Sequence, residues 1–135
     1  MQENEDPPLR VMVVEDEMMV AMLIEDMLLD LGCAMVGPFV RLGEALEAAR
    51  EEEVDAAVLD FNLNGEVIYP VAWTLRERNI PFVFATGYGS NVLSDSFMGI
   101  PLLQKPFQRD DLQWALRRAL QQSTSGPIEI GSPAR

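Results

Sequence analysis

The feature that most constrains the fold is an alternation between short, mainly apolar runs and longer segments with helical spacing of apolar residues. The apolar runs occupy residues 11–14, 34–40, 56–59, 82–86 and 102–104. Short runs without polar alternation are typical of strands buried on both faces. The repeated strand–helix order therefore predicts an α/β fold, in which helices wind on both faces of a five-stranded parallel sheet.

The intervening segments predict the helices. The first spans residues 18–31, with Gly32 as its stop signal, and its expected buried stripe is Val20, Leu23, Ile24, Met27, Leu28 and Leu31. Further helices are expected over residues 43–53, from near Pro70 to residue 79, and, more weakly, over 92–97. The last helix has Asp110 or Asp111 in its first turn and a stripe of Leu112, Ala115, Leu116, Ala119 and Leu120. Gly37-Pro38 interrupts the second apolar run, which predicts an edge strand there.

The chain has 135 residues, the length of one domain. Residues 1–9 are polar and interrupted by prolines, and we expect an N-terminal tail. Residues 10–121 are expected to form the folded domain, and residues 122–135, rich in Ser, Gly and Pro, a flexible C-terminal tail. Only about a dozen residues follow the last helix, so we expect no effector domain.

Charge and composition exclude several classes of function. The formal net charge is −12, with no basic run, which argues against direct nucleic-acid binding. No apolar run approaches the roughly 18 residues of a membrane span, and the acidic N-terminus is not a signal peptide, so no membrane insertion is expected. The single cysteine, Cys33, is expected to be a core thiol and is compatible with the reducing cytoplasm.

The chain contains no histidine and only one lysine, Lys105. Without histidine, it cannot carry a phosphoryl group on an imidazole ring or form a His-based triad. Phosphoryl chemistry would therefore need a carboxylate or hydroxyl acceptor and an outside donor.

Polar residues follow four of the five predicted strands directly. Glu15 and Asp16 follow the first strand, Asp60 the third, Thr86 ends the fourth and Lys105 follows the fifth. In parallel sheets of this kind, ligands bind beyond the carboxyl ends of the strands. We therefore expect these side chains to meet at one edge of the sheet.

Three carboxylates brought together in a cleft repel one another unless they take up protons or bind a cation. Such hard oxygen ligands suit Mg²⁺. Phosphoryl transfer needs positioning and neutralisation of the phosphoryl oxygens, which Mg²⁺, Lys105 and the Thr86 hydroxyl could supply. Asp60 would be the nucleophile and would form an acyl phosphate.

At these residues the chain resembles the receiver domains of two-component response regulators. The matching blocks are VMVVEDE, AVLDFNLNG, FVFATGYG and LLQKPF, and the resemblance covers about residues 10–121. It implies a flavodoxin-like sheet with strand order 2-1-3-4-5 and Asp60 as the phosphoacceptor. It also implies direct Mg²⁺ ligands from Asp16, Asp60 and the backbone carbonyl of Asn62, with Glu15 acting through water. Thr86 would be the switch hydroxyl, Lys105 the phosphate-binding cation, and a histidine kinase or histidine phosphotransferase the donor.

The chain departs from the family pattern at the aromatic switch residue, expected three positions before the lysine, where this chain has Leu102. The continuation Thr86-Gly87-Tyr88-Gly89, with the LNG loop and Tyr69-Pro70, resembles the FAT GUY type of single-domain receivers. On that resemblance Tyr88 takes over the switch role, and its replacement by Ala would alter signalling while Asp60 is still phosphorylated.

Two surfaces are candidates for partners. Trp114 lies nearly opposite the buried stripe of the last helix, as an exposed anchor or as a ring lying flat on the surface. Met18, Met19 and Met22 open the first helix beside the acidic residues. Core and rim packing is the favoured interpretation for these methionines, and docking of a kinase or phosphotransferase is the alternative.

Three other functions compete with a phosphoacceptor that signals by protein contact or phosphoryl shuttling. A degenerate receiver would bind partners without phosphorylation, but every expected pocket residue is present. An Asp-nucleophile phosphatase would need a second acid where this chain has Asn62. A flavin carrier would need a phosphate-binding loop after the first strand, where Glu15, Asp16 and Glu17 would repel phosphate. We therefore expect no enzyme activity beyond the chain's own phosphotransfer and autodephosphorylation.

Overall fold

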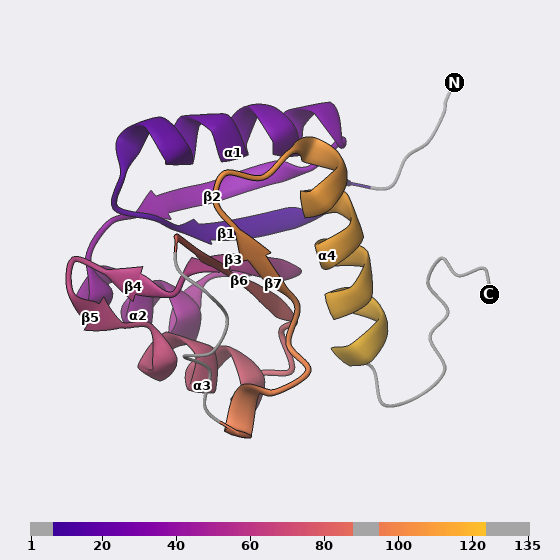
Figure 1. The fold of residues 1–135 in the computed structure, drawn as a ribbon. Coiled ribbons are helices and arrows are strands. Elements are labelled where there is room, and N and C mark those ends of the chain that lie inside the picture. The colour runs from indigo at the N-terminus through magenta and orange to yellow at the C-terminus, as the bar shows by residue number, and fades with distance from the viewer. Residues whose placement is uncertain (1–6, 88–94, 124–135) are drawn as a thin grey trace.

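The computed structural model describes residues 7–87 and 95–123 and contains the predicted five-stranded parallel sheet. Its strands are β1 (Arg10–Val14), β2 (Ala34–Phe39), β3 (Ala56–Asp60), β6 (Phe82–Thr86) and β7 (Leu102–Gln104). They lie in the order β2-β1-β3-β6-β7, and every neighbouring pair is parallel (Figure 1). This order is the predicted 2-1-3-4-5, so the doubly wound, flavodoxin-like topology is confirmed.

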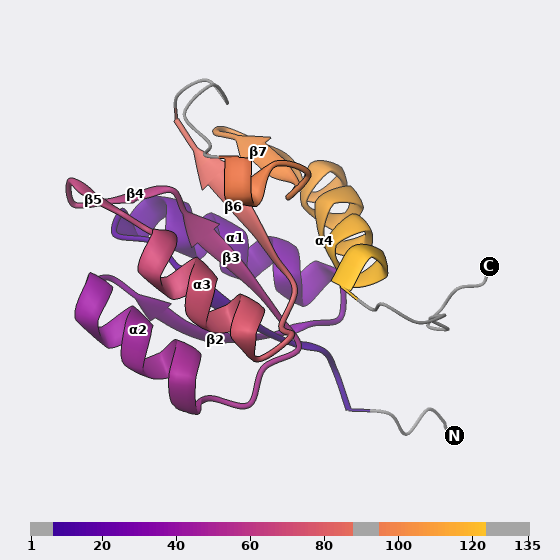
Figure 2. The same cartoon turned by 90° about the horizontal axis from the view of Figure 1, so that it is seen from below.

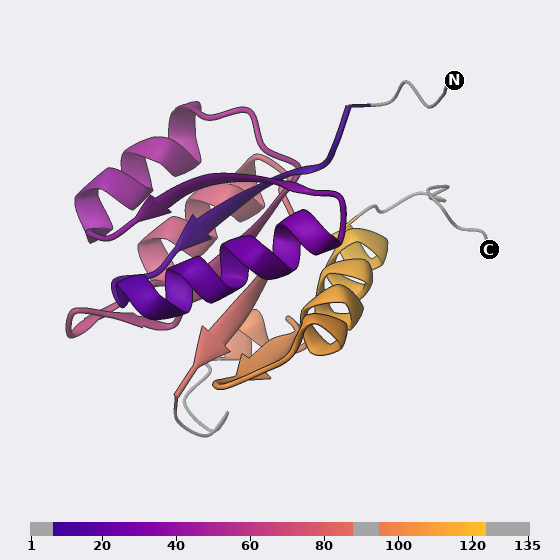
Figure 3. The ribbon, with the colours of Figure 1, turned by 90° about the horizontal axis from the view of Figure 1, so that it is seen from above.

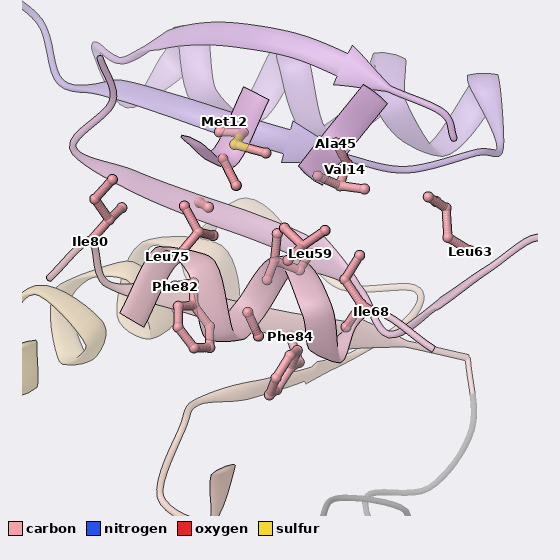
Figure 4. Packing of buried hydrophobic residues seen from close by; sticks show 14 of the residues in the cluster. Met12, Val14, Ala45, Leu59, Leu63, Ile68, Leu75, Ile80, Phe82 and Phe84 are labelled. Atoms are coloured by element: carbon pink, nitrogen blue, oxygen red, sulfur yellow. The ribbon is translucent and has the colours of Figure 1, made fainter. Parts of the chain in front are cut away.

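Four helices cover the two faces of the sheet: α1 (Met18–Asp30), α2 (Leu42–Glu51), α3 (Tyr69–Glu77) and α4 (Arg109–Ser123). Figures 2 and 3 show α2 and α3 on one face and α1 and α4 on the other. Successive strand residues point to opposite faces. In β1, Met12 and Val14 accordingly pack towards α2 and α3, whereas Val11 and Val13 pack towards α1 and α4. Figure 4 shows the first of these two cores.

The first helix buries a narrower stripe than its apolar spacing predicts. Its buried residues are Ala21, Ile24 and Leu28. Leu23, expected in the core, is 56% exposed. The helix has more apolar residues than the side facing the sheet can cover, and Ala21 is buried although it was not part of the predicted stripe. Of the core and rim packing favoured for the opening methionines, the core part is wrong, because Met18, Met19 and Met22 are all exposed.

The segment Asn62–Glu66, expected as a loop, contains a short antiparallel hairpin. Strand β4 (Asn62–Leu63) pairs with β5 (Glu66–Val67). The turn residues Asn64 and Gly65 have φ values of 53° and 86°. An Asn-Gly pair with two positive φ angles is the preferred two-residue hairpin turn, because it matches the twist of the flanking strands.

The remaining elements agree with the expectations to within about two residues at their ends. Strand β2 lies at one edge of the sheet as predicted. The α4 helix runs to Ser123, past the expected domain end at residue 121. The weak helix over 92–97 falls partly outside the described residues, and its described part is a single 3₁₀ turn, η2 (Asp95–Phe97). Cys33 is half-buried and packs against the core under α1 and α4.

No described helix has the length and apolarity that a membrane crossing requires.

Candidate functional site

The strand exits meet in one surface pocket of about 410 Å³. Its lining residues come from segments far apart in the sequence: Asp16, Glu17, Asp60, Asn62, Asn64, Gly65, Thr86, Gly87 and Lys105. Because β1, β3, β6 and β7 are parallel, their carboxyl ends reach the same edge of the sheet. The predicted convergence is therefore confirmed for the residues after these strands.

Three carboxylates form the acidic part of the site. Ligand oxygens of Glu15, Asp16 and Asp60 all lie within 4.8 Å of one another. Glu15 and Asp60 are almost completely buried, with 1% and 5% of their surface exposed. Asp60 ends β3 between two neighbouring strands, and its Oδ1 accepts a bond from the Asn62 amide at 3.3 Å. The sheet thus holds the two buried carboxylates rigidly beside each other.

Lys105 is the cation in this acidic pocket. Its Nζ lies 2.8 Å from Glu15 Oε1, 3.4 Å from Asp60 Oδ2 and 3.8 Å from Glu17 Oε1. Its side chain is largely buried, at 15% exposure. Burial works against the ammonium charge, but the bond to Glu15 and the attraction of Asp60 outweigh it and raise the pKa of Lys105. The amine therefore remains a cation at physiological pH.

The pKa of Asp60 is strongly raised by its surroundings. Burial is the main cause and the negative charge of Glu15 the second, and together they raise the pKa of Asp60 to about 8. Lys105 acts in the opposite direction but only partly compensates. The metal-free pocket thus holds more negative charge than one ammonium can balance.

Thr86 ends β6, one residue beyond Ala85, which pairs with Asp60 across the two strands. It is buried at 2% exposure and lines the pocket. Its backbone carbonyl accepts a bond from the Lys105 amide at 2.8 Å, and the Ala85 carbonyl accepts one from Phe61 at 2.8 Å. These backbone bonds tie the exits of β3, β6 and β7 together, so that the hydroxyl, the carboxylate and the ammonium are held around one space.

The hairpin adds contacts that the sequence analysis did not identify. The Asn64 amide donates to Asp16 Oδ2 at 3.0 Å, and its side-chain amide donates to the Val40 carbonyl at 3.3 Å. The Gly65 amide donates to the side-chain carbonyl of Asn62 at 2.8 Å. The hairpin therefore orients Asp16 and holds Asn62 at the pocket. The Asn64-Gly65 dipeptide was the signal that could have revealed it.

The donor set fits a hard divalent cation. Clustered carboxylates with an exposed, oxygen-lined opening are typical of Mg²⁺ sites, which use few protein carboxylates and keep several waters. A divalent cation would also relieve the repulsion that raises the pKa of Asp60. The cluster of Glu15, Asp16 and Asp60 can therefore bind a metal, while Asn62 stands beside it in the pocket lining.

The sequence analysis also singled out the switch position and two candidate partner surfaces. Tyr88 lies outside the described residues. Leu102, in the usual aromatic position, is partly buried against the core under α2 and α3. Trp114 is 56% exposed, and the Arg118 guanidinium lies 5.3 Å from the centre of its ring. Met18 and Met19 are exposed at the start of α1, near the acidic pocket.

The strand order, the helices on both faces and the acidic pocket beyond the strand ends define a flavodoxin-like α/β domain with a candidate metal site. Residues 11–117 match the response regulator receiver domain family, and the chain belongs to this family. It is a receiver domain of two-component and phosphorelay signalling, a class of modules that histidine kinases or phosphotransferases phosphorylate. A search of curated proteins found no match.

Solved structures of single-domain receivers resemble this chain throughout the fold. The solution structure of SdrG from Sphingomonas melonis Fr1 shares 40% identity, covers 86% of this chain and 99% of its own, and superposes with a TM-score of 0.77. The BeF3-activated conformation of SdrG, from Pseudomonas melonis Fr1, shares 41% identity, covers 82% and 95%, and has a TM-score of 0.71.

A more distant structure shares the fold. The receiver domain of the sensor histidine kinase PA1611 from Pseudomonas aeruginosa PAO1 is 24% identical, with a TM-score of 0.68 and coverage of 84% of this chain and 98% of its own. That receiver has a magnesium ion coordinated in its active-site cleft.

Proposed function

We propose that this receiver accepts a phosphoryl group on Asp60 in a Mg²⁺-dependent reaction. The observation that carries the proposal is the joint position of Asp60, the neighbouring acids and Lys105, whose Nζ lies 3.4 Å from Asp60 Oδ2. The BeF3-activated conformation of SdrG supports it, because that receiver is 41% identical to this chain.

In the proposed reaction, a carboxylate oxygen of Asp60 attacks the phosphorus of a phosphohistidine. The new O–P bond forms as the P–N bond breaks, and the imidazole leaves with the electron pair and takes up a proton. The product is an aspartyl phosphate. Asp60 must be ionised to attack, so the surrounding cations have to overcome the burial that raises its pKa to about 8.

Asp16 and Asp60 are the direct metal ligands in this proposal, with the backbone carbonyl of Asn62 as the third and Glu15 acting through water. The Asn64 amide fixes the orientation of Asp16 at 3.0 Å. Bound Mg²⁺ would neutralise charge on the phosphoryl oxygens. The magnesium-bound receiver of PA1611 supports this site through the shared fold.

Lys105 and Thr86 complete the neutralisation of the transferred group. Lys105 already lies within 3.4 Å of Asp60 and can turn from the acids to a phosphoryl oxygen. The Thr86 hydroxyl would bind another oxygen and act as the switch residue, because its strand end is tied to Lys105 through the backbone. We propose Tyr88 as the partner of Thr86 in the switch, since Leu102 has no ring to move.

A histidine kinase or histidine phosphotransferase is the proposed donor, and α1 its docking face. An apolar groove of about 310 Å³ runs beside α1 and shares Glu17, Gly87 and Lys105 with the acidic pocket. Val20, Leu23 and Met27 of α1 line this groove, and the exposed Met18 and Met19 open the same helix. A donor seated there would place its phosphohistidine at Asp60.

We place this reaction in the cytoplasm, and propose that output follows by protein contact or by phosphoryl shuttling. Trp114 is a candidate residue for such a contact.

The test is incubation of the protein with phosphoramidate or acetyl phosphate and Mg²⁺, followed by intact mass spectrometry. We expect the mass of one phosphoryl group on the wild type and none on Asp60→Asn. A chelator should prevent labelling, and Asp16→Asn should reduce it by more than tenfold.

The alternative is a receiver that binds partners without phosphorylation. It predicts an unchanged mass for the wild type under conditions that label another receiver in the same assay. That result would exclude the phosphoacceptor function.

A further inference from the structure

We propose that Glu17 is a specificity residue that disfavours free anionic phosphoryl donors at the pocket, and so selects donors that present a cation beside it. This inference rests on the proposed phosphorylation of Asp60 and concerns the choice of donor for the same site.

Glu17 stands at the entrance rather than in the acidic cluster. Its carboxylate lies 3.8 Å from Lys105 Nζ, and its side chain is 66% exposed. It lines both the acidic pocket and the apolar groove beside α1. A phosphoryl donor entering between these two surfaces therefore passes close to this charge.

In the described part of the chain, the long ion pair with Lys105 is the one polar contact of the Glu17 carboxylate. Glu17 precedes α1 as the residue that caps it, but its carboxylate makes no capping hydrogen bond. Its backbone amide donates to Glu15 Oε2 at 3.1 Å, and its carbonyl accepts a bond from Ala21. A change from Glu to Gln removes the charge and leaves these backbone bonds in place.

The net negative charge of the pocket explains why small anionic donors are disfavoured. Four carboxylates, from Glu15, Asp16, Glu17 and Asp60, face the single ammonium of Lys105. With a divalent cation bound, the pocket still has one excess negative charge, which Glu17 accounts for. Acetyl phosphate enters as a dianion and is repelled more than monoanionic phosphoramidate. At separations of about 6–8 Å in water the repulsion of a dianion is twice that of a monoanion, and salt screens both.

A protein donor can turn the same charge to its advantage. A lysine or arginine next to the apolar side chains that fill the groove would pair with Glu17 while the phosphohistidine reaches Asp60. Like charges disfavour wrong partners, and complementary charges speed the encounter with the right one. Glu17 thus favours a donor with a cationic protein surface over a free phosphate compound.

The experiment compares wild type, Glu17→Gln and the matched control Glu25→Gln, which removes one exposed carboxylate from α1, the helix that Glu17 precedes. Asp60 phosphorylation is followed with acetyl phosphate and with phosphoramidate, at saturating Mg²⁺ because Glu17 also attracts the metal. We expect Glu17→Gln to speed the reaction with acetyl phosphate about two- to five-fold at low salt, and that with phosphoramidate by less. Both gains should shrink at high salt.

Three results would overturn the inference: equal rates for Glu17→Gln and Glu25→Gln, equal acceleration with both donors, or a gain that does not respond to salt. A merely structural role predicts instead a lower melting temperature and no dependence on donor charge. If the wild type takes up no phosphoryl group from either donor, the proposed function fails. If it is labelled but the variants behave alike, only the role of Glu17 fails.

Discussion

At the scale of single residues, the surroundings of Asp60 disfavour the ionised form of its carboxyl group. Burial and the adjacent Glu15 raise its pKa from the ordinary value of 3.8 to about 8. The folded, metal-free protein therefore holds a proton on Asp60 that the unfolded chain releases near pH 4. Since the folded state binds more protons between these values, its stability falls as the pH rises from about 4 to 8.

Replacing Asp60 with Asn should consequently stabilise the metal-free protein, because Asn cannot ionise. The gain should be near zero at pH 4, grow towards pH 8, and reach on the order of 4 kcal/mol at pH 7. Urea unfolding in the presence of a chelator, at several pH values, measures it. The control is Asp26→Asn, at an exposed position on α1, which should change little. A gain that is the same at every pH would contradict the assignment.

At the scale of secondary-structure elements, Gly37 determines how the edge strand β2 passes the end of β1. Its φ is +109°, and an added Cβ would lie 2.8 Å from the Val13 carbonyl oxygen and 2.9 Å from the Phe39 ring. The register between the two strands shifts here, between Met12 and Val14. Both the backbone conformation and the close approach therefore require glycine.

Gly37→Ala should destabilise the protein by about 1–3 kcal/mol through strain and overlap. Gly43→Ala is the matched control, since Gly43 is the second residue of α2 and nothing lies within 4 Å of an added Cβ. That change should stabilise the protein by up to about 0.5 kcal/mol, because a first-turn position carries only part of the mid-helix cost of glycine. Thermal unfolding of the two variants decides the matter. If both shift the melting temperature in the same direction, Gly37 is not under the constraint that its geometry implies.

At the scale of the whole molecule, the candidate metal ligands come together only when β1 and β3 pair in the sheet. Glu15 and Asp16 follow β1, whereas Asp60 ends β3. A cation that binds this arrangement binds the folded state alone, and so stabilises it against unfolding. Below pH 8, the proton on Asp60 competes with the cation for the same carboxylate.

We therefore expect Mg²⁺ to raise the melting temperature, and to do so more at pH 8 than at pH 6. A Mg²⁺ concentration of about one hundred times its dissociation constant corresponds to about 2.7 kcal/mol of added stability. Differential scanning calorimetry with and without Mg²⁺ tests this. Asp16→Asn should lose most of the shift, and an undiminished shift in that variant would place the metal elsewhere.

Much of the fold and of the site was predictable for local reasons. The apolar runs identified all five strands of the main sheet, and their carboxyl ends identified Asp60, Thr86 and Lys105. The hairpin at Asn64-Gly65 was not predicted. Its Asn-Gly pair favours a hairpin turn, but the sequence analysis expects only a loop in this segment. The exposure of Leu23 and the opening methionines could not be derived, since helical spacing marks an apolar side but not how much of it the sheet covers.

By itself, the sequence determined the order of strands and helices and the residue types at the strand ends, because hydrophobic periodicity and turn chemistry act over a few neighbours. Only the tertiary structure decided that Lys105 pairs with Glu15 and lies near Glu17, and that Asn64 orients Asp16. It also decided that burial and the charge of Glu15 raise the pKa of Asp60 to about 8. Those properties depend on distances between segments remote in the chain and on exclusion of water from between them, and both arise only when the sheet has assembled.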